Sequence, residues 1–164
     1  MYIRLGILEG KYSIHAWWCN MSNFTVRVQD LTNFDRLVQE LKAEVMNSCT
    51  DVVNDIVYTA RGSAPHDTGY LEKCISATIH KGNGTFKAEV GVSAYDNGFD
   101  YGALRHDYPF NLGPGSQAKS PSHSNITGNT YPVGYNFAAG SADANADGYC
   151  DFIEENIQQV LDNY

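Results

Sequence analysis

Hydrophobic residues recur every three or four positions from Leu31 to Ala60, which is the spacing of one face of an α-helix. Val38, Val53 and Val57 widen this face, so we expect it to contact more than one surface. A helix of about 30 residues would be ~45 Å long. A compact domain of this size is only about 30 Å across. The pattern therefore predicts a helix that bends or that packs partly on a neighbouring subunit.

After residue 74 the pattern changes to alternation of apolar and polar side chains, which is typical of strands. Residues 75–80 and 86–92 both alternate, and Gly82-Asn83-Gly84 between them predicts a hairpin turn. Shorter runs predict three further strands, at 3–7, 24–28 and 101–104.

Toward the end of the chain, apolar residues at helical spacing predict a second helix over 152–164. Residues 108–134 are rich in Pro, Gly, Ser and Asn, so we expect a long loop that is flexible unless a partner orders it. The predicted fold class is α+β, with a long N-terminal helix and a C-terminal helix packed on a small antiparallel β-sheet. We interpret residues 1–20 as an N-terminal extension, either a strand or an appendage, and 21–164 as a single domain.

Between the long helix and the hairpin lies a stretch rich in turn-forming residues. Gly62 suits the position after a helix C-terminus, and Pro65 prevents the helix from continuing. Asp67 and Thr68 can cap the next element, and Gly69 permits a turn with positive φ. We interpret the stretch as a structural motif that fixes the angle between helix and hairpin. Its residues are Ala64, Pro65, Asp67, Thr68, Gly69 and Leu71.

The chain of 164 residues carries 19 acidic and 11 basic side chains, a net charge of −8. This balance argues against a nucleic-acid-binding surface based on positive charge. The four cysteines are far apart and match no metal or redox signature. The N-terminus lacks a signal-peptide core, and no stretch approaches the roughly 18 apolar residues of a membrane span. We therefore expect a soluble protein made in the cytoplasm, with reduced thiols and no membrane partner.

Residues 143–154 match the spacing of an EF-hand calcium loop. Residues 135–140 are too short and too rich in glycine for a convincing entering helix, and no second loop is present. The alternative is an acidic N-terminus of the last helix, which the helix dipole favours. A small calcium-binding module is therefore the second functional hypothesis, and no other cofactor is expected. Its candidate ligands are Asp143, Asn145, Asp147, Tyr149, Asp151 and Glu154.

Two His-Asp neighbours, His66-Asp67 and His106-Asp107, are the candidate catalytic pairs. The chain has no nucleophile elbow, P-loop or dinucleotide-binding glycine pattern. Adjacent residues on a strand point to opposite faces, so such neighbours rarely form a dyad. A small hydrolase that uses His106 or Cys74 is the third hypothesis, and we expect no enzymatic activity.

The Ala-Pro-x-Asp-Thr-Gly-x-Leu stretch resembles a recurring motif of tailed-phage neck and tail-completion proteins, a family that includes minor capsid proteins and lambdoid-type tail components. Ala64 to Leu71 and Ile75 match that motif, and Cys74 stands in place of its Ser. A second block, Tyr101–Asp107, has Gly102 for Ala and His-Asp where an acidic pair or His-Glu is usual. A third block at 131–138 is similar only loosely. The resemblance covers about residues 24–164 in the order of elements.

This resemblance implies a structural virion protein of a tailed phage, located in the neck and assembled in the host cytoplasm. It implies a homo-oligomeric ring of about six copies at the head–tail junction. The implied partners are a head connector or head-closure protein and a tail terminator or tail-tube protein. An acidic surface suits a channel through which DNA slides without sequence-specific binding.

Overall fold

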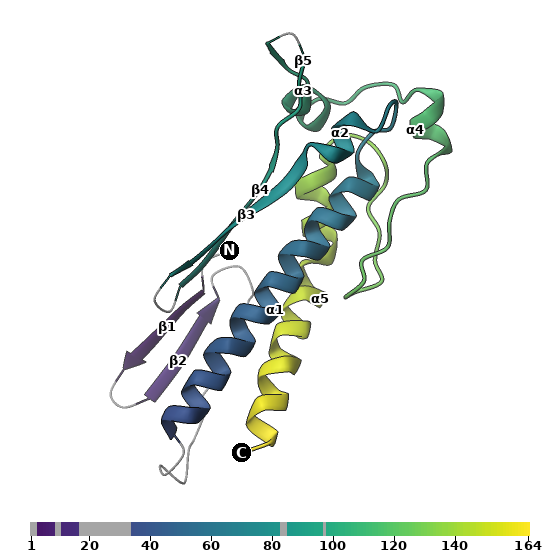
Figure 1. Cartoon of the computed structure of the whole chain (residues 1–164). Coiled ribbons are helices and arrows are strands. Elements are labelled where there is room, and N and C mark those ends of the chain that lie inside the picture. Colours follow the sequence, from purple (N-terminus) through teal and green to yellow (C-terminus); the bar gives the residue numbers. More distant parts are fainter. Residues whose placement is uncertain (1–2, 9–10, 17–33, 83–84, 97) are drawn as a thin grey trace. The chain divides into compact units, whose positions relative to one another are not determined.

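The computed structural model (Figure 1) contains helices and strands in one chain, which confirms the predicted α+β class. It describes residues 3–8, 11–16, 34–82, 85–96 and 98–164, so the strand predicted at 24–28 lies outside the described residues. The helices are α1 (Phe34–Ser63), α2 (Tyr70–Lys73), α3 (Tyr101–Asp107), α4 (Pro114–Ala118) and α5 (Phe137–Asp162). The strands are β1 (Ile3–Leu8), β2 (Lys11–Ala16), β3 (Ile75–Gly82), β4 (Thr85–Val92), β5 (Tyr95–Asp96) and β6 (Phe99–Asp100).

The chain divides into two compact units. The first comprises residues 1–51, 79–88 and 150–164, and the second comprises 52–78 and 89–149. The motif at 64–71 and the segment at 108–134 both belong to the second unit, which therefore contains the candidate site.

The predicted long helix is α1, which is 30 residues long. Its apolar face is buried at Leu37, Val45, Cys49, Val52, Val53 and Ala60. The prediction that Gly62 follows the helix C-terminus was wrong, because the helix continues to Ser63. A Cβ atom at Gly62 would overlap the side chain and backbone nitrogen of Ser122. The glycine therefore permits close approach of another segment and does not end the helix.

One four-stranded sheet has the order β2-β1-β4-β3, and β5 and β6 form a separate antiparallel pair. The predicted hairpin is β3–β4. The strand expected at 3–7 is β1, which pairs with β2 and, through Ile3 and Arg4, with β4. The N-terminal residues described by the structure thus extend the sheet.

The strand predicted at 101–104 was wrong, because these residues begin helix α3. Asp100 Oδ1 accepts a hydrogen bond from the Ala103 amide at 2.9 Å, which is the interaction of a helix N-cap. Four residues are too few for an alternating pattern to outweigh such a cap.

The core of the second unit joins both long helices to the hairpin. Phe137 of α5, Leu71 of α2 and Ile75 of β3 are each buried in it. The other buried members are Ala60, Ala64 and Ala94, and Val90 and Val92 of β4 pack against the cluster. The 64–71 motif therefore lies where helix, turn and hairpin share one core.

Helix α5 begins at Phe137, well before the predicted start at 152. Its contacts with α1 run in opposite directions along the two helices. Tyr149 bonds to Asp55 in the second unit, and Asn156 bonds to Ser48 in the first. The two helices are therefore antiparallel, and in each unit they share a hydrogen bond between buried or half-buried side chains.

Residues 119–134, the connecting segment between α4 and α5, are organised around the carboxylate of Asp55 on α1. This side chain is buried, with 5% of the residue exposed. Its Oδ2 accepts hydrogen bonds from Ser124 Oγ at 2.5 Å and from the Tyr149 hydroxyl at 2.8 Å. Its Oδ1 accepts from the backbone nitrogen of Asn125 at 2.8 Å and from the Asn125 side chain at 3.1 Å. One carboxylate thus joins α1, α5 and the connecting segment.

Further bonds fix both ends of the connecting segment to α1. Lys119 Nζ donates to the carbonyl oxygens of Arg61 at 2.7 Å and Ala64 at 2.8 Å. Ser63 Oγ donates to the Tyr131 carbonyl at 2.7 Å, and the Ser63 carbonyl accepts from the Gly134 amide at 3.0 Å. The expectation that 108–134 is ordered only by a partner was wrong for residues 119–134, because their own chain supplies these contacts.

Glycines on the two long helices make room for the connecting segment. A Cβ atom at Gly140 of α5 would overlap the ring of Tyr131, and one at Gly148 would lie 2.6 Å from Thr127 Cγ2. Gly62 of α1 faces Ser122 in the same way. The segment can therefore lie closer to both helices than any side chain at these positions would allow.

We expect Asp55→Ala to lower the free energy of unfolding by about 3 kcal/mol, because several buried donors lose their acceptor. Chemical denaturation measures this change, and amide hydrogen exchange should become faster in residues 119–134. The exposed Asp51 on the same helix provides the matched control, since Asp51→Ala should change stability by less than about 0.5 kcal/mol. Equal stability of Asp55→Ala and wild type would contradict this role of the carboxylate.

We expect Gly62→Ala to destabilise the protein, although alanine is better than glycine in a helix interior by about 1 kcal/mol. The added methyl group must displace Ser122, and such overpacking costs about 1–3 kcal/mol. Thermal and denaturant unfolding measure the sign. Gly91→Ala is the control, because no atom lies within 4 Å of a Cβ at Gly91. A more stable Gly62→Ala variant would refute the proposed close approach.

Candidate functional site: a pocket at the 64–71 turn

A pocket of about 620 Å³ opens beside the 64–71 motif in the second unit. Most of its apolar wall comes from Pro65, Leu71 and three tyrosines. Its polar groups include Arg105, Asp67 and Thr68. The tyrosines are Tyr70, Tyr95 and Tyr101, and Gly69 completes the lining. The volume lies in the range of about 300–1,000 Å³ that is typical of ligand pockets.

The motif residues have two kinds of environment. Ala64 and Leu71 are core residues, with 0% and 4% exposure, and Pro65 is buried. Gly69 has a φ of 76°, the left-handed conformation that the sequence predicted for it. Asp67 and Thr68 are exposed at the pocket. The motif thus builds one wall of the pocket from a turn that is fixed in the core.

The prediction that Asp67 or Thr68 caps the next helix was wrong. Helix α2 begins at Tyr70, directly after Gly69, and Gly69 is its N-cap residue without a side-chain cap. Because the chain makes a left-handed turn at Gly69, the two polar side chains lie outside the helix and are free to face a ligand or partner.

Two of the pocket's tyrosines, Tyr70 and Tyr95, belong to a larger set of exposed hydrophobic side chains on α2, on the β5–β6 pair, and in or just after α3. Among the described residues, eight large hydrophobic side chains are well exposed, and five of these form what we call the aromatic surface. Its members are Tyr70, Tyr95, Phe99, Leu104 and Tyr108, and Tyr95, Phe99 and Tyr108 are each more than half exposed. Clusters of exposed apolar side chains on soluble proteins usually mark interaction sites.

Hydrogen bonds join the elements that carry the aromatic surface. The Tyr70 hydroxyl of α2 donates to the Tyr95 carbonyl of β5 at 2.9 Å. The Gly102 amide of α3 donates to the Ala94 carbonyl at 3.1 Å. These bonds, together with the pairing of β5 with β6, therefore hold the exposed side chains of α2, β5, β6 and α3 in fixed positions relative to one another.

Arg105 of α3 is the cation of the pocket. Its guanidinium carbon lies 4.5 Å from the ring centre of Phe110 and 5.1 Å from that of Tyr101. These distances are within the range of cation–π interactions, so two rings restrict the position of the charge. Arg105 Nε is buried and has no hydrogen-bond partner among the described residues.

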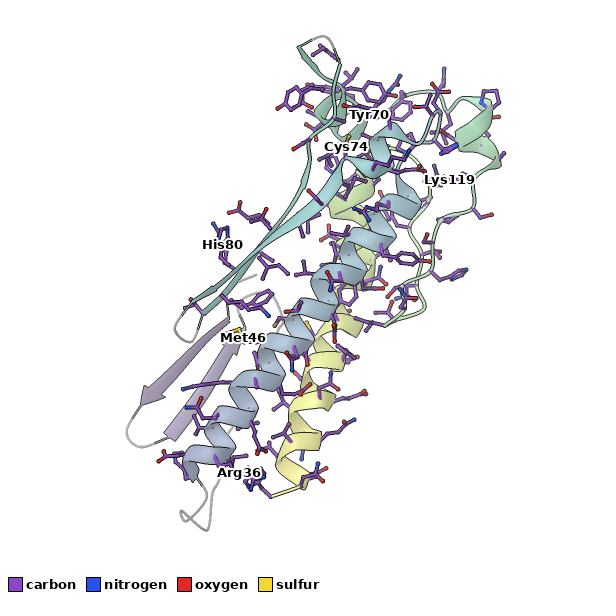
Figure 2. The ribbon with its side chains drawn as sticks, in the orientation of Figure 1. Arg36, Met46, Tyr70, Cys74, His80 and Lys119 are labelled. Carbon is purple, nitrogen blue, oxygen red and sulfur yellow. The ribbon has the colours of Figure 1, made fainter. Side chains whose placement is uncertain are left out.

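Next to the pocket, a polar cluster joins α2 to the start of the connecting segment. Glu72 Oε1 accepts a hydrogen bond from Lys119 Nζ and lies 3.2 Å from His66 Nδ1. The Ser116 hydroxyl of α4 bonds to both the amide and the carbonyl of His66. Figure 2 shows Lys119 near the end of α1 and beside α2. The turn is thus supported by α4 and by Lys119, a half-buried residue of the connecting segment.

The pKa of Glu72 reflects two opposing effects. Burial raises the pKa. The hydrogen bonds from Lys119 and then His66, together with the charges of these two residues, lower the pKa by more than burial raises it. The pKa of the carboxyl group therefore lies below its usual value, and the charged form is favoured in the folded protein.

The structure differs from the expected calcium loop, because residues 143–154 lie within the continuous helix α5. Positions two apart lie on nearly opposite sides of a helix, so alternate residues cannot surround one ion. Asn145 and Tyr149 are buried, and their side chains bond to Thr127 and Asp55. The remaining candidate ligands, all exposed, are Asp143, Asp147, Asp151 and Glu154. Several alanines before Gly148 favour the helix.

In the described part of the chain, no group of three or more His, Cys, Asp or Glu side chains is placed to hold a metal ion. Calcium binding itself stays a prediction.

The burial of Tyr149 and its hydrogen bond to Asp55 both raise the pKa of its hydroxyl, which therefore remains a donor.

The residues of the hydrolase hypothesis each have contacts with other side chains. His106 Nδ1 lies 2.7 Å from Asp107 Oδ1, and its ring contacts Phe137 edge to face. Cys74 packs against the core cluster.

Burial raises the pKa of Cys49 to about 12, so this thiol is a poor nucleophile at neutral pH. Cys49 and Cys74 are free, but Cys150 is disulfide-bonded, so the expectation of reduced thiols fails there.

Comparison with protein-family models, with characterised proteins and with solved structures finds no match to this chain. Across the residues that the structure describes, no helix is long and apolar enough to cross a membrane.

Sequence reasoning missed two important residues, Asp55 and Arg105. The sequence did contain a signal for Asp55, because small polar residues recur at helical spacing within α1, beside its apolar face. These residues are Ser48, Asp55, Thr59 and Ser63, and all four are buried. No comparable signal existed for Arg105, because its environment depends on the helix that replaced the predicted strand.

We expect the free energy of unfolding to fall as the pH drops below about 4.5, partly through Glu72. A carboxyl group with a lowered folded-state pKa stabilises the protein above its unfolded pKa, and this contribution is lost as the pH falls through the folded value. Denaturation between pH 3 and pH 7 should therefore show a weaker pH dependence in Glu72→Gln and in Lys119→Met than in wild type. The exposed Glu154→Gln is the control, and identical pH profiles for all variants would exclude this contribution.

Proposed function

We propose that this chain is a structural virion protein of a tailed phage that forms a ring at the head–tail junction. The resemblance of Ala64–Leu71 to the motif of neck and tail-completion proteins is the first support. The order of long helix, hairpin and closing helix is consistent with the elements that this family implies. Ala64 and Leu71 of the motif are buried in the core, and Gly69 has the positive φ of a turn, which is consistent with a structural role for these residues.

The observation that carries the proposal is the aromatic surface next to the motif. Tyr95, Phe99 and Tyr108 expose 60%, 56% and 64% of their area, and β5–β6, α3 and the residue after α3 position them. Protein interfaces are enriched in aromatic residues and in arginine, and the pocket offers both. A site for contact with other proteins accounts for this composition better than a site for catalysis.

The charge of the chain supports a role close to DNA without tight binding. The excess of 19 acidic over 11 basic side chains repels the phosphate backbone. DNA could then pass through a ring of such subunits without being held. The partners in this proposal are other copies of the chain, a head connector or head-closure protein, and a tail terminator or tail-tube protein.

We expect the purified protein, alone or with its head-connector partner, to form rings with a mass several times 18.1 kDa. Light scattering coupled to size exclusion measures the mass, and negative-stain microscopy shows the ring. Replacing Tyr95 and Phe99 by serine should abolish assembly and leave the fold intact. Tyr58→Ser is the matched control, because Tyr58 is also exposed but lies on α1, outside the aromatic surface.

The second hypothesis, a calcium-binding module, makes the opposite prediction in the same experiment. A strict monomer that remains monomeric with the connector protein, and whose melting temperature rises on calcium addition, would contradict the ring. Assembly that is unaffected by calcium or by a chelator would favour it.

A further inference from the structure

Strand β3 forms one edge of the four-stranded sheet, because β4 is its only neighbour among the described strands. Successive residues of an antiparallel strand direct their backbone N–H and C=O groups alternately toward its two sides. The Cys74 carbonyl accepts a hydrogen bond from the Ser93 amide, which follows β4. The next carbonyl, that of Ile75, accepts instead from the guanidinium of Arg61. Ile75 and every second residue after it therefore direct these groups away from β4.

The rest of this outer edge has backbone groups without a partner. Arg61 binds only the carbonyl of Ile75. In the described chain, no hydrogen bond from outside the sheet reaches the backbone of the three remaining outward residues, which are Ala77, Ile79 and Lys81. Lys81 and the neighbouring His80 are exposed, so this part of the edge is accessible. Strand β3 contains no proline and no acidic residue, and a free edge of this kind is a template for pairing with another strand.

The opposite edge of the described sheet is strand β2. Leu8 of β1 pairs with Lys11 of β2 across a two-residue connection, and the pair that flanks such a connection is the hydrogen-bonded kind. Lys11 and every second residue after it therefore direct their backbone groups toward β1. The alternate residues direct theirs outward, and they are Tyr12, Ile14 and Ala16. Each edge of the sheet thus has three outward residues available for pairing.

The direction of the strands allows one copy of the sheet to continue into the next. Strand β1 is antiparallel to both β2 and β4, and β4 returns antiparallel to β3 through the hairpin. Strand direction therefore alternates across the sheet. If a second copy repeats the sheet beside the first, its β2 lies antiparallel to β3, which is the same relation as between neighbours within one copy.

The two edges also agree in the face of the sheet to which their outward residues belong. On β3 these residues alternate with exposed ones and share a face with the buried Ile75. On β2, Ala16 pairs with Ile3, and Ile3 pairs in turn with the buried Phe86 of β4. Both sets therefore belong to the core face. Pairing of the two edges continues this face from one copy to the next, whereas a shift by one residue would reverse it.

We propose that the outer edge of β3 in one copy pairs with the outer edge of β2 in the next copy. In the antiparallel register that uses every outward residue, Ala77 lies opposite Ala16. Ile79 then lies opposite Ile14, so apolar residue types meet. This contact rests on the proposed ring. Because the two edges differ, the pairing is head to tail, as a closed ring requires. It adds a backbone contact to the one made by the aromatic surface.

A proline on the free edge tests the pairing in the full-length chain. Ala77→Pro should weaken association by about 10-fold or more, because it removes an N–H donor and its ring blocks close approach. The fold should persist, since this N–H faces away from β4 and edge positions tolerate proline. Ala77→Ser keeps the N–H and is the matched control, with association within about twofold of wild type. Analytical ultracentrifugation measures association, and circular dichroism verifies folding.

Paired cysteines test the register independently, including the case in which the proline variant does not fold. Hydrogen-bonded antiparallel pairs have Cα atoms about 5.5 Å apart, within reach of a disulfide. Ala77→Cys combined with Ala16→Cys should form covalent oligomers in steps of 18.1 kDa on mild oxidation. The two positions lie on opposite edges of the sheet, so the bond joins different copies. Ala77→Cys with Ser13→Cys is the control, because Ser13 faces β1, and each single variant controls for the native thiols.

Three outcomes would overturn the contact while the ring itself stands. The first is a folded Ala77→Pro variant that assembles like wild type. The second is an assembled ring of the Ala77→Cys and Ala16→Cys variant that does not crosslink. The third is crosslinking by Ile79→Cys alone, which would indicate that β3 pairs with β3 of a second copy.

A wild-type protein that forms no ring even with the connector protein would instead refute the proposed function, and this contact with it. A covalent ladder from the cysteine pair in assembled rings, together with weakened association of Ala77→Pro, would establish the pairing.

Discussion

The buried carboxylate of Asp55 is the interaction on which the second unit depends. It accepts hydrogen bonds from Ser124, from the backbone and side chain of Asn125, and from Tyr149. A buried charge is costly unless it is well bonded, and here every bond reaches an element distant in sequence. The network therefore selects one position for the connecting segment against α1 and α5. Lys119 at the start of that segment then bonds to the C-terminal end of α1 and to Glu72 of α2. The connecting segment thus also stabilises the turn at the pocket, through Lys119.

The pocket and its aromatic surface follow from this support. A buried core fixes Ala64 and Leu71, while Gly69 turns the chain so that Asp67, Thr68 and Tyr70 face outward. The residues that hold the turn are therefore buried, and they differ from the exposed residues that we propose contact a partner. A rigid support also lowers the entropy lost on association, which is consistent with the proposed assembly into a ring.

Periodic parts of the fold could be predicted from the sequence, and local or long-range details could not. The helical spacing from Leu31 to Ala60 predicted α1, and alternation predicted the β3–β4 hairpin. Gly62 was misread as a helix end because its real neighbour, Ser122, is distant in sequence. Residues 143–154 match a calcium-loop spacing, but Asn145 and Tyr149 are buried in a helix by contacts with residues 127 and 55. The turn at Gly69 was predictable, whereas the Arg105 pocket required α3, which the sequence pattern did not indicate.

We propose that the aromatic surface next to the 64–71 turn joins subunits of a phage neck ring. The most direct measurement is a cryo-electron microscopy reconstruction of the assembled particle, formed from wild-type protein with its connector. We expect a closed ring in which Tyr95, Phe99 and Tyr108 are covered by the neighbouring copy. A ring in which these side chains face solvent, or particles that contain only monomers, would contradict it.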